Sequence, residues 1–240
     1  MTIESDAVGE SLPVNVVVPE DAEGDRRRPL LVFLHGRADD GDGEESNLND
    51  EMYAALDDQG DRAPIVAFPS GGEASYWHDR ADGDWGTYVT EEVIPKVAKE
   101  FDVDTDRVAI GGISMGGYGA FDIARLNPGR FCAVGGHSPA LWQSAGETAP
   151  GAFDDAEDFG DHDVVGAAAS APGPYLGQSV WLDSGDADPF RPGIDAFAAE
   201  LQAAGAPLTL KIWAGAHEGD YWRSHWDSYM RFYARTLARC

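Results

Sequence analysis

The fold is decided by the stretch Val108-Ala-Ile-Gly-Gly-Ile-Ser-Met-Gly-Gly117, which contains the pattern Gly-x-Ser-x-Gly. An apolar run leads into the pattern, and a helical pattern from Met115 to Leu126 leads out of it. A serine at so sharp a turn needs small neighbours, and the glycines two positions before and after Ser114 provide them. The stretch therefore predicts a strand–turn–helix unit that presents Ser114 as a nucleophile. The alternative is a glycine-rich turn in which Ser114 only caps a helix.

Apolar, β-rich segments alternate with helical patterns on both sides of this unit. Such alternation is typical of an α/β fold, a mostly parallel central sheet with helices on both faces. Leu30–Leu34 is continuously apolar, which predicts a strand buried on both faces. The predicted strands are 14–18, 30–34, 64–68, 107–111, 131–135, 180–183 and 208–213, with a polar turn over 20–28. The predicted helices are 51–59, 88–101, 115–126, 189–204 and a closing aromatic helix over 222–237.

No internal repeat or linker divides the chain, so we expect a single domain over residues 1–240. Trp142–Gly177 is rich in Ala, Gly, Asp and Pro, and we interpret it as an irregular, lid-like insertion. Pro95 lies inside the predicted helix 88–101 and should kink or split it. The aromatic stripe of the closing helix, from Trp222 to Leu237, has a helical period and should face the core.

The charge of the chain restricts its partners. Lys+Arg 17 against Asp+Glu 43 gives a formal net charge of -26, which disfavours nucleic acid and anionic membrane surfaces. No apolar run is long enough to span a membrane, and Met1–Glu10 lacks the apolar core of a secretory signal. Cys132 and Cys240 are too few for a disulfide scaffold. These features predict a cytoplasmic protein with no membrane partner.

Small groups of aspartates, such as Asp39, Asp40 and Asp42, recur along the chain. The chain has only three lysines, Lys96, Lys99 and Lys211. Carboxylates in excess keep a protein hydrated when salt screens their mutual repulsion. The composition therefore indicates a halophilic protein, and the alternative is a protein that is merely acidic.

A serine hydroxyl is a poor nucleophile until a base removes its proton, so Ser114 requires a histidine and a carboxylate. His217 follows the last predicted strand, at the edge of the sheet where parallel strands end, and is the predicted base. Its alternative is a surface histidine beside Glu218. His225 lies inside the closing helix, away from that edge.

Three aspartates follow the predicted strand 180–183. Asp188 lies beyond the turn at Gly185, from where a loop residue can reach an imidazole, so it is the favoured acid. Asp186 comes next and Asp183 last. The alternative for Asp188 is a helix N-cap, because Pro189 follows it.

Two backbone amides are candidates for stabilising an oxyanion. The amide of Met115 lies at the N-terminus of the predicted helix after Ser114. The second donor should come from the loop 35–38 after the strand 30–34, and we assign it to the amide of Arg37.

With these residues, the chain resembles the esterase D-like (putative esterase) family of α/β-hydrolases. The resemblance rests on Pro29-Leu-Leu-Val-Phe-Leu-His35-Gly36, Ser75-Tyr-Trp77-His78, Gly112-Ile-Ser114-Met-Gly-Gly117, Asp183-Ser-Gly185-Asp-Ala-Asp188 and Gly215-Ala-His217. It implies an α/β-hydrolase fold without a large cap domain, with Asp188 as acid, His217 as base and no metal or organic cofactor.

The resemblance and the residues together predict a carboxylesterase-type serine hydrolase acting on a small-molecule ester or thioester. The alternatives are an acyltransferase to a sugar or alcohol, or a non-catalytic binding protein with this fold. A metal-dependent hydrolase using Asp183 and Asp186 lacks the usual histidine spacing. Aromatic groups in loops at the same sheet edge suit an acyl or aryl group, although each could equally serve packing. The predicted substrate contacts are Trp77, His78, Trp85, His137 and Trp142.

Overall fold

The computed structural model describes residues 1–19, 27–37 and 43–240. The predicted acidic cluster Asp39, Asp40 and Asp42 lies outside these residues. So do residue 38 of the predicted oxyanion loop and most of the predicted turn 20–28.

The described chain is built on one large sheet with the strand order β1-β2-β4-β3-β7-β8-β9-β10. The first two strands run antiparallel to their neighbours, and all the later pairs are parallel. All seven predicted strands are present. The strands are β1 (Thr2–Glu4), β2 (Ser11–Val17), β3 (Arg28–Leu34), β4 (Ile65–Pro69), β7 (Val103–Ile113), β8 (Ala133–His137), β9 (Ser179–Gly185) and β10 (Leu208–Trp213).

Three of the shorter strands were not predicted. β1 is one, and the others are β5 (Asp79–Arg80) and β6 (Gly83–Asp84), which form a separate small hairpin. Strands of two or three residues carry too little alternation for their period to be recognised in a sequence.

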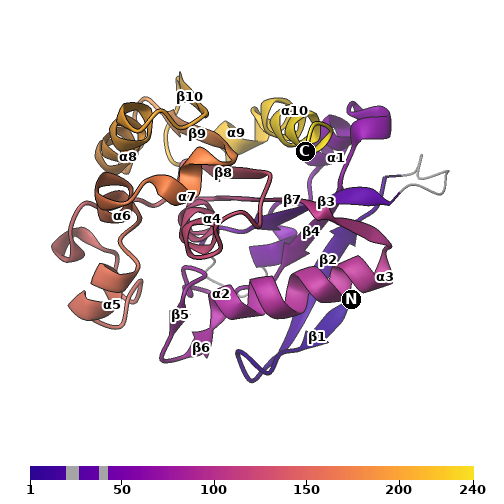
Figure 1. The fold of residues 1–240 in the computed structure, drawn as a ribbon, viewed down its shortest axis with the longest axis horizontal. Coiled ribbons are helices and arrows are strands. Elements are labelled where there is room, and N and C mark those ends of the chain that lie inside the picture. Colours follow the sequence, from indigo (N-terminus) through magenta and orange to yellow (C-terminus); the bar gives the residue numbers. More distant parts are fainter. Residues whose placement is uncertain (20–26, 38–42) are drawn as a thin grey trace.

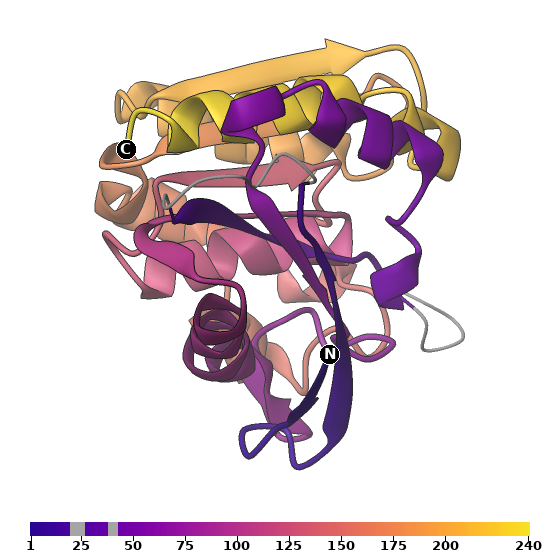
Figure 2. The same ribbon diagram turned by 90° about the vertical axis from the view of Figure 1, so that its right-hand side faces the viewer.

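Helices cover both faces of the sheet (Figure 1, Figure 2). The helices α1 (Asp50–Asp57) and α10 (Trp226–Leu237) pack together on one face, and α3 (Ile94–Glu100), α4 (Met115–Leu126) and α8 (Arg191–Ala203) cover the other. Along β3, the side chains of Leu30, Val32 and Leu34 pack in the core under α3, α4 and α8. Those of Leu31 and Phe33 pack in the core under α1 and α10. The strand is therefore buried on both faces, as predicted.

The closing segment divides into α9 (Gly219–Arg223) and α10. The predicted core face of the closing helix is confirmed for α10, where Trp226, Tyr229, Met230, Tyr233 and Leu237 are buried.

Pro95 lies where the helical segment changes type, and the segment is not split there as the prediction allowed. The helical segment begins as α2 (Trp85–Thr87), continues as the π-helix η3 (Tyr88–Val93) and ends as α3, which has Pro95 in its first turn. The first turn of a helix needs no hydrogen bond from its N–H groups, so a residue without one is tolerated there.

Trp142–Gly177 is not irregular, which corrects the prediction. It contains the 3-10 turn η4 (Ala145–Glu147), α5 (Ala156–Asp161), α6 (Val164–Ser170) and α7 (Gly173–Leu176). Asp155 and Asp163 cap α5 and α6 by accepting hydrogen bonds from backbone N–H groups in the first turns. The aspartates that suggested a loop are therefore helix starts, and the alanines between them are good helix formers.

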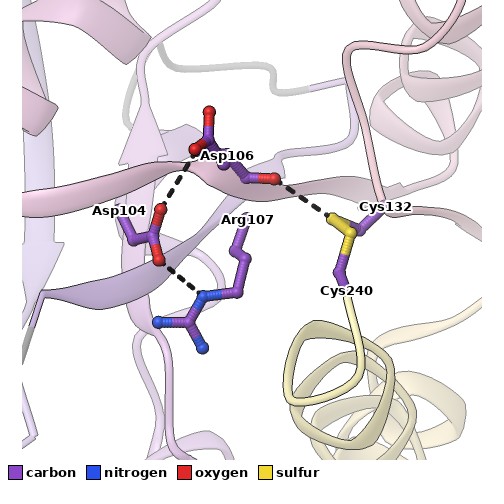
Figure 3. Close-up of a disulfide and its surroundings, with 5 residues drawn as sticks. All are labelled: Asp104, Asp106, Arg107, Cys132 and Cys240. Carbon is purple, nitrogen blue, oxygen red and sulfur yellow. Dashed lines mark hydrogen bonds and ion pairs between the residues drawn. A yellow bond between two sulfur atoms is a disulfide. The ribbon is translucent and has the colours of Figure 1, made fainter.

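Cys132 and Cys240 form one disulfide (Figure 3). Two cysteines are too few for a disulfide scaffold, as expected, but the bond between them was not predicted. It joins the residue before β8 to the residue at the end of the closing helical segment, across a sequence separation of 108. Within the part of the chain that the structure describes, no helix has the length and apolar character needed to cross a bilayer.

Candidate active site

Ser114 lies at the turn between β7 and α4 with a φ of +54°, a conformation that is costly for a residue other than glycine. The two flanking glycines make the turn possible. A Cβ at Gly112 would lie 2.5 Å from the carbonyl carbon of Gly116, and a Cβ at Gly116 would lie 2.1 Å from the carbonyl oxygen of Leu34. The Gly-x-Ser-x-Gly pattern therefore has a local steric cause, as predicted.

The structure brings Ser114, His217 and Asp188 into one hydrogen-bonded chain. His217 Nε2 lies 2.8 Å from Ser114 Oγ, and His217 Nδ1 lies 3.0 Å from Asp188 Oδ2. Because an ionised carboxylate only accepts hydrogen bonds, Nδ1–H donates to Asp188 and Nε2 is left to accept the serine proton. The Asp188 side chain is fully buried, whereas that of His217 is 20% exposed.

The three aspartates after β9 have different roles. Asp188 contacts His217 and also accepts a hydrogen bond from the amide of Phe190 through Oδ1, at 2.8 Å. Asp186 accepts one from the amide of Gly215 at 3.1 Å and so holds the loop that leads to His217. Asp183 is buried within the sheet and does not contact the base. Of these three aspartates, Asp188 is therefore the one that contacts the imidazole, and it remains our candidate for the acid.

The loop after β3 lies beside Ser114. A Cβ at Gly36 would lie 3.4 Å from Ser114 Cβ. His35 accepts a hydrogen bond from the amide of Gly71 at Nε2, and burial lowers the pKa of His35 to about 4, so its ring is neutral at pH 7. Met115 is the first residue of α4, so its amide has no partner within the helix. The amides of Met115 and Arg37 therefore remain our candidates for the oxyanion donors.

The side chain of Arg37 crosses to the insertion. Its guanidinium donates to the carbonyl of Pro150 at 3.2 Å, and its charge lies near the hydroxyl of Tyr76. Burial raises the pKa of Tyr76, and the nearby Arg37 charge acts against that rise. Arg37 thus links the loop beside Ser114 to the segment 142–177.

Aromatic rings flank the His217 imidazole. Its ring centroid lies 4.9 Å from that of Phe190 and 5.0 Å from that of Trp222. Trp142 packs on Phe190 at 5.6 Å and on Tyr76 at 5.4 Å. Among the five predicted substrate contacts, Trp142 is the one that packs directly on a ring in contact with His217, although it is itself buried, with 8% exposed.

The other four predicted substrate contacts are packed in the interior, and that prediction was wrong for them. Trp77 and Trp85 are buried, and Trp77 donates to the carbonyl of His35. The His78 side chain is fully buried with Nε2 3.2 Å from Asp158. His137 is fully buried and lies 2.7 Å from Asp183. Their positions in the chain place them near the sheet edge, but the direction in which a loop side chain points depends on packing.

Phe190 and Trp222, whose rings contact the His217 imidazole, were not predicted from the sequence. Phe190 follows Asp188–Pro189 directly, so it could have been found once Asp188 was accepted as the acid. Trp222 fits the period of the closing aromatic stripe, and the break between α9 and α10 instead turns it toward His217.

A second polar cluster joins the insertion to α4 and shares no side chain with the triad. His162 Nδ1 lies 2.8 Å from Asp122 of α4, and Asp122 also pairs with Arg125. Burial opposes the charge on His162, but its hydrogen bond with Asp122 and the nearby Asp158 outweigh this, so the pKa of His162 is raised. Burial and the neighbouring His162 lower the pKa of His78. Over residues 1–19, 27–37 and 43–240, no three His, Cys, Asp or Glu side chains are grouped as a metal site requires.

The fold agrees with comparisons to known proteins. The structure superposes on a ferulic acid esterase with a TM-score of 0.84 at 23% identity, covering 98% of this chain and 97% of that one. It also superposes on the fluorophosphonate-binding serine hydrolase F of Staphylococcus aureus with a TM-score of 0.78 at 18% identity, covering 98% and 96%. The protein therefore has the α/β-hydrolase fold.

The family follows from the sequence comparison. The family model described as "Putative esterase" matches residues 5–232, so the chain belongs to the putative esterase family, as the resemblance predicted. Esterase Rv1288 of Mycobacterium tuberculosis is 27% identical over 143 residues, which are 56% of this chain and 30% of that protein. The chain thus spans well under two thirds of the length of the curated relatives that it matches.

Proposed function

We propose that this protein is a carboxylesterase-type serine hydrolase that cleaves a small-molecule carboxylic ester or thioester through an acyl-enzyme. The observation that carries the proposal is the hydrogen-bonded chain from Ser114 Oγ through His217 to Asp188, at 2.8 and 3.0 Å. Membership of the putative esterase family supports the same reaction class.

In the acylation step, His217 Nε2 takes the hydroxyl proton while Ser114 Oγ attacks the carbonyl carbon of the substrate. The negative charge that develops on the carbonyl oxygen is stabilised by the amides of Met115 and Arg37. Asp188 keeps the imidazole in the tautomer that can accept at Nε2 and stabilises the imidazolium that forms. The tetrahedral intermediate then collapses, and His217 returns the proton to the departing alcohol or thiol.

Deacylation repeats these steps with water in place of the hydroxyl. His217 takes a proton from a water molecule, the resulting hydroxide attacks the acyl carbon, and the proton passes back to Ser114 Oγ as the acid leaves. The partial exposure of His217 gives water access to the base. One active site therefore supports both halves of the reaction.

The substrate is proposed to be a small ester whose acyl or alcohol part packs on Phe190, Trp142 and Trp222. Aromatic side chains suit apolar groups. The formal charge of -26 continues to disfavour nucleic acid as a partner.

Labelling with a fluorophosphonate probe tests the nucleophile, and a panel of p-nitrophenyl esters of increasing acyl length tests the reaction. Wild-type protein should label and hydrolyse short esters, and Ser114→Ala should abolish both. A wild-type protein that neither labels nor hydrolyses would favour a non-catalytic binding protein instead. Preferential transfer of the acyl group to an added alcohol or sugar would identify an acyltransferase.

We further propose that the acidity reflects a high-salt environment. Unfolding temperatures measured from low to molar KCl should rise, since salt screens repulsion among the carboxylates. No rise would contradict the proposal. The cytoplasmic location stays a prediction, and the Cys132–Cys240 disulfide weighs against it because such bonds are uncommon in a reducing cytosol.

A further inference from the structure

A buried group of polar side chains surrounds Asp183 on the face of the sheet that α10 covers, and we call it the Asp183 network. Its members are Asp183, His137, Trp181, Tyr221, Tyr229 and Tyr233. The reaction proposed above uses none of these side chains. Asp183 and His137 are fully buried, so neither can contact a substrate.

The Asp183 carboxylate is saturated with hydrogen bonds. Oδ2 accepts from His137 Nδ1–H and from Trp181 Nε1–H, each at 2.7 Å. Oδ1 accepts from the hydroxyls of Tyr221 at 2.9 Å and Tyr229 at 3.1 Å. A carboxylate offers about four lone-pair sites, and a buried one is costly unless they are used. The network therefore holds its members in one arrangement.

The tyrosines of the network remain hydrogen-bond donors. Burial, followed by the nearby Asp183 charge, raises the pKa of both Tyr221 and Tyr229 well above the usual range. Their hydroxyls stay protonated at any pH where the protein would be assayed. Loss of either hydroxyl thus removes one hydrogen bond from the same carboxylate oxygen.

Tyr221 connects the network to the catalytic base. It lies in α9, which begins two residues after His217. The Tyr221 ring also packs against Gly215, which lies two residues before His217 in the chain. A Cβ at Gly215 would lie 2.8 Å from Tyr221 Cδ2. The loop that carries His217 therefore wraps around the Tyr221 ring, whose hydroxyl is fixed to β9 through Asp183.

The other two members of the triad are tied to the same strands. Asp188 follows β9, the strand that contains Asp183. The amide of Ser114 donates to the carbonyl oxygen of His137 at 3.1 Å, and the His137 side chain donates to Asp183. One buried carboxylate is thus connected to all three segments: to the acid through its own strand, to the base through Tyr221, and to the nucleophile through His137.

We infer that Asp183, acting through Tyr221, is a positioning residue that holds His217 in register with Asp188 and Ser114. The inference rests on the proposed serine-hydrolase function. A displacement of about 1 Å at a catalytic group can cost about a hundredfold in rate, so loss of one anchoring hydrogen bond should be measurable. Tyr229 donates to the same oxygen but belongs to α10, which does not carry the base.

The two tyrosines provide a matched pair of variants. Tyr221→Phe and Tyr229→Phe each remove one hydroxyl and one hydrogen bond to Asp183 Oδ1, so both should lower the unfolding temperature to a similar extent. Tyr221→Phe alone should lower kcat, by about tenfold or more, with KM unchanged. Tyr229→Phe should keep kcat within about twofold of the wild type. The rate of fluorophosphonate labelling should follow kcat in both variants.

A second comparison asks whether Tyr221 acts through the base. His217→Ala should retain a small residual rate, and adding Tyr221→Phe to it should leave that rate unchanged, since the positioned group is already absent. Equal kcat losses in the two tyrosine variants, an unchanged kcat in Tyr221→Phe, or a further loss in the double variant would each overturn the inference.

These results separate the inference from the function on which it rests. Normal hydrolysis by wild type together with normal kcat in Tyr221→Phe refutes the positioning role and leaves the serine hydrolase standing. A wild type that neither hydrolyses esters nor labels refutes both.

Discussion

Removal of the Cys132–Cys240 disulfide should destabilise the protein without impairing its chemistry. The bond, drawn in Figure 3, lies at the start of β8. Because β7 and β8 are parallel, this is the end of the sheet opposite to the carboxyl end of β7, after which Ser114 lies. It holds the end of the chain after α10, whose buried aromatic face packs on the sheet independently of the bond. Replacing both cysteines by serine, Cys132→Ser/Cys240→Ser, is the perturbation.

The magnitude follows from the length of chain that the bond closes. For a sequence separation of 108, the lost loop entropy of the unfolded chain corresponds to about 4.8 kcal/mol at 25 °C. In a domain of this size, each kcal/mol shifts the unfolding temperature by about 2–4 °C. We therefore expect a decrease of about 10–20 °C in the double variant.

Urea unfolding of the two proteins measures the free energy, and a count of free thiols on purified wild type establishes the bond itself. Wild type kept in reductant is the control, because it should unfold like the double variant. The kcat for a p-nitrophenyl ester should stay within about twofold. A free energy of unfolding that changes by less than about 1 kcal/mol would refute the entropic reasoning, and two free thiols in the wild type would refute the disulfide.

Three further outcomes follow from the site and its surroundings. Asp188→Ala should lower kcat by about ten-thousandfold, because the imidazole loses its orienting partner. Asp186→Ala removes only a hydrogen bond that holds the loop before His217, so its loss of kcat should be far smaller, about tenfold. Equal losses measured by initial rates would contradict this assignment. Gly116→Ala should destabilise the fold by about 1–3 kcal/mol or more, since its Cβ would lie 2.1 Å from a β3 carbonyl oxygen, and an unchanged unfolding free energy would disprove the steric argument. The pKa of His162 is higher in the folded protein than in the unfolded chain, where it is 6.5, so protonated His162 adds to the free energy of unfolding. This contribution is complete below pH 6.5 and is lost as the pH rises through the folded-state pKa. Unfolding free energies measured across this range should fall more in wild type than in His162→Asn, and parallel curves would argue against the pairing with Asp122.

Much of the fold could be predicted because its determinants are local. The Gly-x-Ser-x-Gly turn requires glycines within two residues of Ser114, and steric contact within the turn explains why. The continuous apolar run Leu30–Leu34 predicted a strand buried on both faces, and the structure has one. Short insertion helices were missed because their starts depend on capping by Asp155 and Asp163, residues that equally suit a turn.

The site could be predicted in part. Asp188 and His217 were chosen because both follow predicted strands, and parallel strands bring their carboxyl ends to one edge. That rule places a residue near the edge but gives no direction for its side chain. His137 obeys the rule as well as His217 does, but its side chain is buried in the Asp183 network.

The sequence alone determined the α/β architecture, the strained serine turn and the order in which Ser114, Asp188 and His217 appear. Each depends on period, on neighbouring residues or on strand ends, which are properties of short stretches. The tertiary structure alone decided that Phe190 and Trp222 flank the base, that Cys132 meets Cys240, and that Asp183 accepts four hydrogen bonds. Those contacts join segments far apart in the chain, and they exist only because the sheet and its helices pack in one particular way.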